Sequence, residues 1–280
     1  MKLADGSMWT IEAGDKRASF IVSCFTEAMQ LQPVHEPACQ LLVLGDSHRI
    51  IEPVFGADLF DWVALPPKNN ASVIYILEPV EDDKAFVVQL IRLSLVICLH
   101  AQTRGGLLLH GALAERRGDG VILTGPGNIG KTTASQRLTP PWRSLCDDLT
   151  LVVRDAHGTY WAHPWPTWSR FLSGGPGGTW DVQHAVPLKG IFFLTQAQED
   201  RINPMGVGQA VCMLVESAEH IWGRIPRNEV GVDKIRALRL QRFDNICTLA
   251  QAVPCYLLHL SLTGKFWQKI EKVLAFEDKR

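Results

Sequence analysis

Cysteine pairs at metal-binding or redox spacing are missing from this chain of 280 residues. Its seven cysteines are scattered and odd in number, without a C-x-x-C pair or a histidine at ligand spacing. We interpret them as reduced and mostly buried thiols, which are typical of a cytoplasmic protein. The first six residues include polar ones where a secretory signal peptide needs an apolar core, so we expect a cytoplasmic location.

An excess of charge of one sign is also missing. Lys and Arg total 28, Asp and Glu total 29, and the formal net charge is −1, so we expect neither nucleic acid nor an anionic membrane as a partner. One apolar segment, residues 85–101, is interrupted by Gln89 and Arg92 and lacks the ~18 uninterrupted apolar residues of a membrane span. We therefore predict a buried helix there, and no association with a membrane.

Hydrophobic residues make up 46% of the chain, enough for one large domain or two smaller ones. Over residues 1–83, short apolar runs alternate with turn signals, which favours a small β-rich or mixed α+β region that serves as a platform for a substrate. Asp82 or Asp83 is suited to cap the helix that follows, and Gly105-Gly106 to end it. The apolar runs are residues 20–24, 40–44, 62–65 and 73–77.

Residues 84–280 form the second predicted domain, and its strands pair as hairpins. Residues 107–113 and 120–124 flank a turn at Gly118-Asp119-Gly120, and residues 149–153 and 159–162 flank a second turn. Such hairpins are unusual in an all-parallel nucleotide-binding fold, so we predict an α/β domain with a mixed, partly antiparallel sheet. A buried strand over residues 189–194 and an amphipathic helix over residues 266–274 complete it.

Residues 125–132 are the most informative stretch, because they satisfy G-x-x-x-x-G-K-[ST]. They lie between an apolar strand and a predicted helix over residues 133–138, and Pro140-Pro141 ends that helix. Its glycines let backbone N–H groups point at phosphate oxygens, Lys131 reaches the β and γ phosphates, and the Thr132 hydroxyl ligates Mg²⁺. The alternative is a glycine-rich turn that carries a lysine. The predicted ATP contacts are Gly125, Pro126, Gly127, Asn128, Ile129, Gly130, Lys131, Thr132 and Thr133.

Two acidic residues and one histidine are further candidates. Asp147 and Asp148 follow the segment 142–146, where a strand delivers both carboxylates to the phosphate end of the sheet. One carboxylate then helps to hold Mg²⁺ and the other acts as general base; the alternative is a solvated turn or a helix cap. His110 stands on an apolar strand, where a histidine is either a hydrogen-bonded core residue or a functional group.

These pieces together resemble a known family. His110-Gly111-Ala112-Leu113, the loop 125–132 and Cys146-Asp147-Asp148 are similar in order and spacing to the core of HPr kinase/phosphorylase and related serine kinases, over residues 107–153. The resemblance implies a P-loop kinase core that uses ATP and Mg²⁺. It also implies that Asp148 accepts the proton, that Asp147 and Thr132 hold the metal, and that His110 and Lys131 belong to the catalytic group.

A second resemblance concerns residues 161–169 and 193–197, which are similar to HPr-kinase-like proteins of bacterial peptide-maturation cassettes, such as the SynChlorMet cassette proteins and lasso-peptide tailoring kinases. The C-terminal glutamate and arginine that HPr kinase uses in phosphorylase chemistry are not found. Their lack weighs against dephosphorylation by phosphate and against HPr itself as the substrate. The family resemblance also implies a homo-oligomer.

The acceptor side of the site has two interpretations. Five residues and the glycine-rich residues 173–178 after them form either an acceptor cleft with a lid or a set of core tryptophans with a connector. The five are His163, Trp165, Trp168, Ser169 and Arg170. Arg224 and Arg227 either stabilise phosphoryl charge or are surface arginines.

The sequence therefore predicts an ATP-dependent kinase that acts on a hydroxyl, such as a serine of a small protein or a ribosomally made peptide. The alternatives are a non-catalytic ATP-sensing subunit that docks to maturation enzymes, and a phosphorylase or ATPase.

Overall fold

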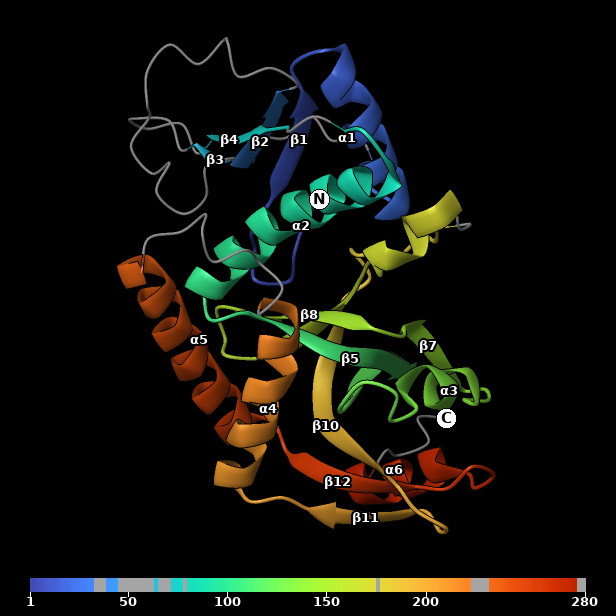
Figure 1. Ribbon diagram of the computed structural model, residues 1–280. Coiled ribbons are helices and arrows are strands. Elements are labelled where there is room, and N and C mark those ends of the chain that lie inside the picture. Colours follow the sequence, from blue (N-terminus) through green and yellow to red (C-terminus); the bar gives the residue numbers. More distant parts are fainter. Residues whose placement is uncertain are drawn as a thin grey trace.

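The computed structural model describes residues 1–32, 39–44, 63–64, 72–77, 80–174, 177–222 and 232–275. Its framework is two mixed β-sheets, a smaller one in the N-terminal part of the chain and a larger one in the remainder (Figure 1). The helix α2 (Asp83–Thr103) runs between the two sheets. The fold is mixed α/β, as the sequence predicts.

The smaller sheet has the strand order β1 (Trp9–Ala13), β2 (Cys39–Leu44), β4 (Ser72–Ile76), β3 (Val63–Ala64). Strand β2 is parallel to both β1 and β4, and β3 is antiparallel to β4. The apolar run over residues 20–24 is not extended, because it lies in the helix α1 (Lys16–Ala28). The buried positions 18, 21, 25 and 28 follow helical spacing, and the side chain of Asp15 caps the first turn by accepting from Ala18 N at 2.9 Å.

Helix α2 supports both sheets. The Asp82 side chain accepts a hydrogen bond from Ala85 N at 2.7 Å, and the helix ends at Arg104, before Gly105 turns the chain with a φ of +89°. By length and composition α2 is apolar enough to cross a membrane, but 72% of its apolar window is buried inside the protein. This burial is what the core helix of a soluble protein shows, and it confirms the predicted buried helix.

Among the described residues, the larger sheet contains eight strands, and seven of them follow the order β11-β12-β10-β6-β5-β8-β9. Strand β10 is parallel to β6 and to β12, whereas β5 is antiparallel to β6, β7 and β8. The predicted mixed sheet is therefore confirmed. Its strands are β5 (Leu107–Arg116), β6 (Asp119–Thr124), β7 (Trp142–Cys146), β8 (Leu149–Arg154), β9 (Tyr160–Trp165), β10 (Val186–Gln196), β11 (Arg201–Pro204) and β12 (Cys255–Leu260).

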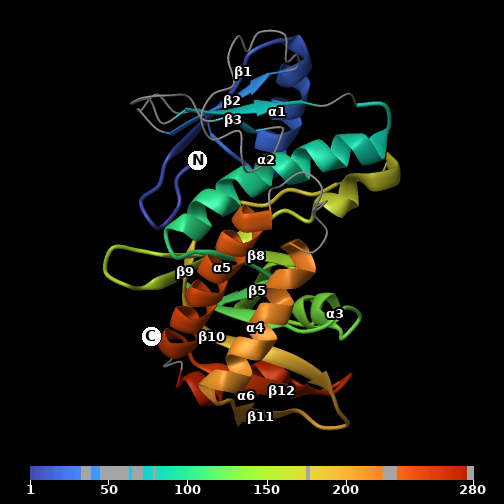
Figure 2. The ribbon, with the colours of Figure 1, turned by 60° about the vertical axis from the view of Figure 1, so that its left-hand side comes forward.

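Helices cover both faces of the larger sheet. On one face, α4 (Val207–Trp222) and α5 (Val232–Ala252) lie side by side, as Figure 2 shows, and α4 contacts β5. On the other face, α3 (Lys131–Gln136) and α6 (Phe266–Leu274) share a buried apolar cluster with the sheet, in which Ala134, Phe192 and Ile270 take part. The observed bounds of α6 are those that the sequence predicts, whereas α3 ends two residues before the predicted Leu138.

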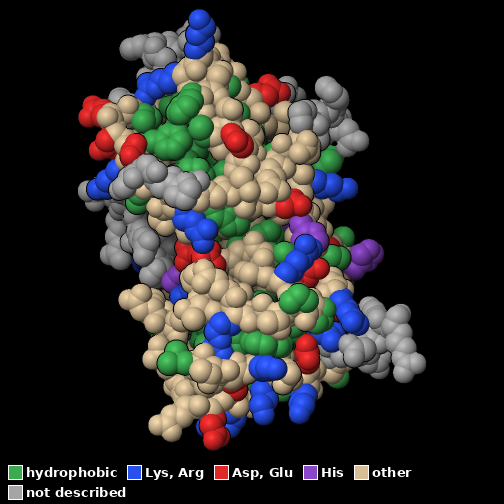
Figure 3. All heavy atoms as spheres, turned by 90° about the vertical axis from the view of Figure 1, so that its right-hand side faces the viewer, with side chains coloured by type: hydrophobic (Ala, Val, Ile, Leu, Met, Phe, Trp, Pro, Cys, Tyr) green, Lys and Arg blue, Asp and Glu red, His purple; other side chains and the backbone are tan. Residues whose placement is uncertain are grey.

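The two sheets share one apolar core. A single cluster of buried side chains extends from the smaller sheet through α2 to the larger one, and the rings of Phe25 and Trp168 stack at a centroid distance of 5.3 Å. Trp168 begins the 3-10 helix η2 (Trp168–Gly174). Figure 3 shows the face on the right-hand side of Figure 1, on which basic and acidic side chains are interspersed.

Candidate functional site

The glycine-rich loop follows the carboxyl end of β6 and leads directly into α3. Gly125, Asn128 and Gly130 have φ values of 153°, 62° and 107°, so three positions of the loop lie in the region that favours glycine. Asn128 adopts the left-handed conformation, which asparagine tolerates better than most residues. Apart from the adjacent residues, no atom lies within 4 Å of a Cβ placed on Gly127 or Gly130, so the backbone there borders open space.

Lys131 folds back onto this loop. Its side chain is buried, and Nζ donates hydrogen bonds to the carbonyl oxygens of Gly125 at 2.9 Å and Pro126 at 3.0 Å. Desolvation lowers the pKa of Lys131, and the negative charge of Asp148 opposes that shift. The ammonium group is thus held at the loop, with a carboxylate nearby, although Asp148 is 17 positions further along the chain, as the residue numbers show.

Asp148 is hydrogen-bonded to His110. The distance between His110 Nε2 and Asp148 Oδ1 is 3.0 Å, and the Asp148 side chain is 36% exposed while that of His110 is 9% exposed. A carboxylate only accepts hydrogen bonds, so the proton of this contact lies on Nε2 when Asp148 is ionised. The contact therefore fixes the orientation of a solvent-accessible carboxylate.

Two buried hydroxyl groups hold the backbone at His110. The Thr124 hydroxyl donates to the His110 carbonyl oxygen at 2.8 Å, and the Ser217 hydroxyl, from α4, accepts from the His110 amide at 3.1 Å. Sequence reasoning missed both residues. Thr124 was visible only as the last residue of a strand, and Ser217 is 107 residues away from its partner, so no local pattern could have found it.

Asp147 has a different environment from its neighbour. Arg170 Nη2, from η2, donates to Asp147 Oδ2 at 2.5 Å, and the Thr167 hydroxyl donates to Oδ1 at 3.4 Å. The two adjacent carboxylates therefore interact with separate groups, one with a histidine and the other with an arginine. A metal ion at Asp147 has to share the carboxylate with Arg170 or displace it.

The donor set fits Mg²⁺ but not a metal cage made of protein alone. No group of three or more His, Cys, Asp or Glu side chains suited to a metal occurs in the described part of the chain. Mg²⁺ does not need one, since it usually takes one or two carboxylates together with water and substrate phosphates. Thr132 is exposed at the start of α3, and the Asp147 and Asp148 side chains are partly accessible.

The aromatic residues proposed for the acceptor cleft belong to the core. Trp165 is fully buried, and Trp168 is 3% exposed, stacks on Phe25 and donates from Nε1 to Ser94 Oγ at 3.1 Å. His163 is fully buried as well. Of the cleft candidates, Arg170 is exposed beside Asp147. Residues 175–176 of the glycine-rich segment, as well as Arg224 and Arg227, lie outside the described residues.

Comparisons with known proteins give a family. No curated protein matches the chain. The family model described as SynChlorMet cassette protein ScmC matches residues 73–275, which include the whole larger sheet, the glycine-rich loop and the Asp147-Asp148 pair. The match covers well over half of the chain, and the chain therefore belongs to the family of the SynChlorMet cassette protein ScmC.

Proposed function

We propose that this protein is an ATP- and Mg²⁺-dependent kinase that transfers the γ-phosphoryl group to a hydroxyl of an acceptor, such as a serine of a peptide or small protein. The supporting observation is the convergence of three distant segments. The loop after β6, the turn between β7 and β8, and His110 on β5 bring Lys131 close to a carboxylate that is hydrogen-bonded to a histidine. Phosphoryl transfer needs a cation for the phosphates and a proton acceptor, and Lys131 and Asp148 are side chains of these two kinds.

The loop and Lys131 bind the triphosphate in this proposal. The backbone from Gly125 to Gly130 supplies N–H donors, and the exposed positions 126, 127 and 128 make them accessible. Lys131 releases the carbonyl oxygens of its own loop and turns to the β and γ phosphates, which are stronger acceptors than neutral carbonyls. The desolvated ammonium thereby regains a full charge partner.

Asp148 accepts the proton of the acceptor hydroxyl. His110 holds one carboxylate oxygen, and this hydrogen bond limits rotation of the side chain so that the carboxylate keeps one orientation. Thr124 and Ser217 hold the His110 backbone in turn. Thr132 and Asp147 are the groups that would hold Mg²⁺, which would neutralise charge on the phosphates.

The test is phosphoryl transfer from γ-labelled ATP to synthetic serine-containing peptides. Asp148→Asn is expected to keep ATP binding and to lose a factor of about 10² to 10⁴ in labelling, since it removes the general base. Asp244→Asn, an exposed substitution of the same type on α5, is the matched control and is expected to label as the wild type does. Equal labelling by both variants would falsify the role of Asp148.

A second candidate function is an ATP-sensing subunit without transfer activity. The observation that favours it is the Asp147–Arg170 ion pair, which engages a carboxylate that the kinase needs for its metal. In this case Mg²⁺ and ATP bind, no acceptor is labelled, and the affinity for a partner protein changes with nucleotide. Release of phosphate without an acceptor would instead indicate an ATPase.

A further inference from the structure

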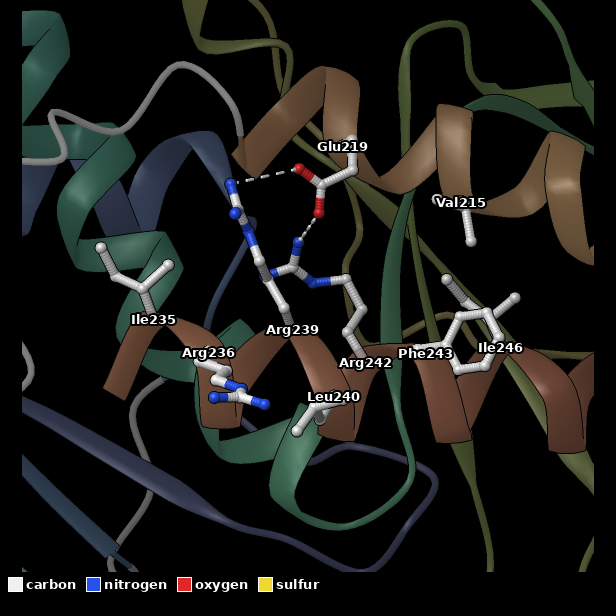
Figure 4. A pocket seen from close by; sticks show the side chains of 9 residues that line it. All are labelled: Val215, Glu219, Ile235, Arg236, Arg239, Leu240, Arg242, Phe243 and Ile246. Atoms are coloured by element: carbon white, nitrogen blue, oxygen red, sulfur yellow. Dashed lines mark hydrogen bonds and ion pairs between the residues drawn. The ribbon is translucent and has the colours of Figure 1, made fainter. Parts of the chain in front are cut away.

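A groove between α4 and α5 lies apart from the candidate site. Its volume is about 760 Å³, which is within the range of pockets that bind ligands or side chains of a partner. None of its lining residues comes from β5, β6, the glycine-rich loop or the Asp147-Asp148 turn. The lining consists of Val215 and Glu219 on α4 and Ile235, Arg236, Arg239, Leu240, Arg242, Phe243 and Ile246 on α5 (Figure 4).

The groove has an apolar part that is open to solvent. Val215 on α4 lies opposite Phe243 and Ile246 on α5 (Figure 4). Leu240 is 57% exposed and Phe243 is 47% exposed, so two large apolar side chains separated by three positions present much of their surface to water. Exposed apolar surface that lines a groove and is rimmed by charge is typical of a binding site.

The charged part of the groove is strongly basic. Arg242 Nη1 lies 2.6 Å from Glu219 Oε1, and Arg239 Nη2 lies 4.0 Å from Glu219 Oε2, so two guanidinium groups share one carboxylate. Arg236 is exposed and points away from Glu219, beside Leu240 (Figure 4). Three arginines against one glutamate leave an excess of two positive charges on the lining. Burial lowers the pKa of Arg242 to about 10, so this charge persists at neutral pH.

Helix α4 separates this groove from the candidate site. Ser217 contacts the His110 backbone on one side of α4, whereas Val215 and Glu219 line the groove on another side. An occupant of the groove therefore leaves the phosphate loop accessible. The groove is suited to docking a partner and not to chemistry at the loop.

We propose that the α4/α5 groove docks an acidic, amphipathic helical peptide segment of a partner protein. Leucine or phenylalanine side chains of that segment pack on Leu240, Phe243 and Val215, because α5 presents apolar side chains at helical spacing and Val215 of α4 lies opposite them. Glutamate or aspartate side chains of the segment pair with Arg236 and Arg239, which gives the complex charge complementarity.

A second copy of this chain is a poorer occupant than an acidic segment. Helix α5 carries Lys234, Arg236, Arg239 and Arg242 against Asp233 and Asp244, so its net charge is 4 − 2 = +2. A symmetric pairing of two α5 helices would place like charges opposite each other, which is unfavourable.

The test uses a fluorescein-labelled synthetic helix with leucine on one face and glutamate along its flanks, titrated with the full-length protein in the absence of nucleotide. We expect a dissociation constant in the range of about 1 to 100 μM. The same helix with lysine in place of glutamate is expected to bind at least about tenfold more weakly, because it places cations against Arg236 and Arg239. Loss of this binding says nothing about phosphoryl transfer, so the two proposals are tested separately.

Two exposed substitutions locate the site without disturbing the core. Arg236→Glu and Leu240→Asp are each expected to weaken binding by about tenfold, through reversed charge and lost apolar contact respectively. Lys269→Glu, an exposed charge reversal on α6, is the matched control and is expected to change little. Far-ultraviolet circular dichroism checks that each variant is folded.

Three results would overturn the proposal. The first is no binding of the glutamate helix up to about 1 mM. The second is equal binding of the glutamate and lysine helices, or binding that neither groove variant weakens. The third is sedimentation of the wild type as a dimer that Leu240→Asp dissociates, which would make a second copy of the chain the occupant.

Discussion

The two sheets differ in what they contribute to the candidate site. The larger sheet carries His110, the glycine-rich loop and both aspartates, whereas the smaller sheet and α1 carry none of these groups. The family match begins at residue 73, within β4, so β1, α1, β2 and β3 lie outside it. The comparison shows that the larger sheet carries the candidate site, whereas the N-terminal part packs against the elements around it.

Part of this packing involves residues 168–174 and 177–182. Trp168 stacks on Phe25 of α1, and Trp180 N donates to Ala28 O at 2.7 Å. The first of these ranges also contains Arg170, which pairs with Asp147. Helix α1 is therefore connected to the site through the 3-10 helix η2, which supplies the arginine that pairs with Asp147.

The largest effect is expected where the two parts join. Phe25→Ala removes a fully buried ring from the stack on Trp168, and we expect the free energy of unfolding to fall by about 3 to 5 kcal/mol. The matched control is Phe20→Ala on the same helix, where the ring is 64% exposed and the loss should be below about 1 kcal/mol. Urea denaturation measures both. Equal losses in the two variants would mean that the Phe25–Trp168 stack contributes no more to stability than a surface contact.

Acid is expected to weaken another contact between the N-terminal part and the larger sheet, the one at His163. This ring accepts from Ala4 N at Nε2 (3.2 Å) and donates from Nδ1 to Val182 O (2.7 Å), so the neutral form fits both contacts. Burial lowers the pKa of His163 below 6.5, and the unfolded chain therefore takes up the proton first. Stability is present above pH 6.5 and is lost as the pH falls below it.

The measurement is the free energy of unfolding between pH 7 and pH 5. His163→Gln is expected to show a smaller decrease over this window than the wild type, because the titrating group is gone. His157→Gln, on an exposed turn, is expected to keep the wild-type decrease. An unchanged slope in His163→Gln would assign the acid sensitivity to other groups.

Helix α2 lies between the sheets, so weakening its first turn affects both. Asp82→Ala removes the side-chain acceptor of Ala85 N, and we expect a loss of about 1 kcal/mol in the free energy of unfolding. Asp83→Ala, one position further along, removes only a charge near the helix start and should cost less. Thermal unfolding measures the loss of stability in both variants. A larger loss for Asp83→Ala than for Asp82→Ala would contradict the capping role of Asp82.

The smallest effect is expected at the Asp147–Arg170 pair. Arg170→Gln removes the cation that pairs with Asp147. We therefore expect the affinity of the ADP-bound protein for Mg²⁺ to rise by about threefold, which is the size of effect expected for a partly exposed ion pair. Arg154→Gln is the control, an exposed arginine on β8. Isothermal titration calorimetry measures the affinity. An unchanged value in Arg170→Gln would remove Asp147 from the metal site.

Local sequence patterns predicted most elements of the larger sheet. The strand pairs around residues 117–118 and 155–158, the strand within β10 and the helix α6 are present as expected, because turn residues and apolar periodicity act over a few positions. The turn of the first hairpin lies at Arg117-Gly118, where both residues have positive φ, whereas the predicted turn is Gly118-Asp119-Gly120. In the smaller sheet the pattern was less informative, since the short apolar run over residues 20–24 fits a strand as well as the helix that forms.

The candidate site, too, could be predicted from the sequence only in part. The glycine-rich loop was readable from its own residues, because its positive-φ positions need glycine or asparagine at fixed places in the sequence. Local order could not decide the partners of Asp147 and Asp148. The position of η2 places Arg170 at one carboxylate, and the position of β5 places His110 at the other.

The amino-acid order alone thus defined the loop, the hairpins and the terminal helix, since their geometry depends on near neighbours in the chain. Tertiary packing decided that Trp165 and Trp168 are core residues, that Ser217 holds the His110 backbone, and that α4 and α5 leave a basic groove between them. Those contacts join residues far apart in sequence, and they depend on which faces of the helices and sheets are buried together.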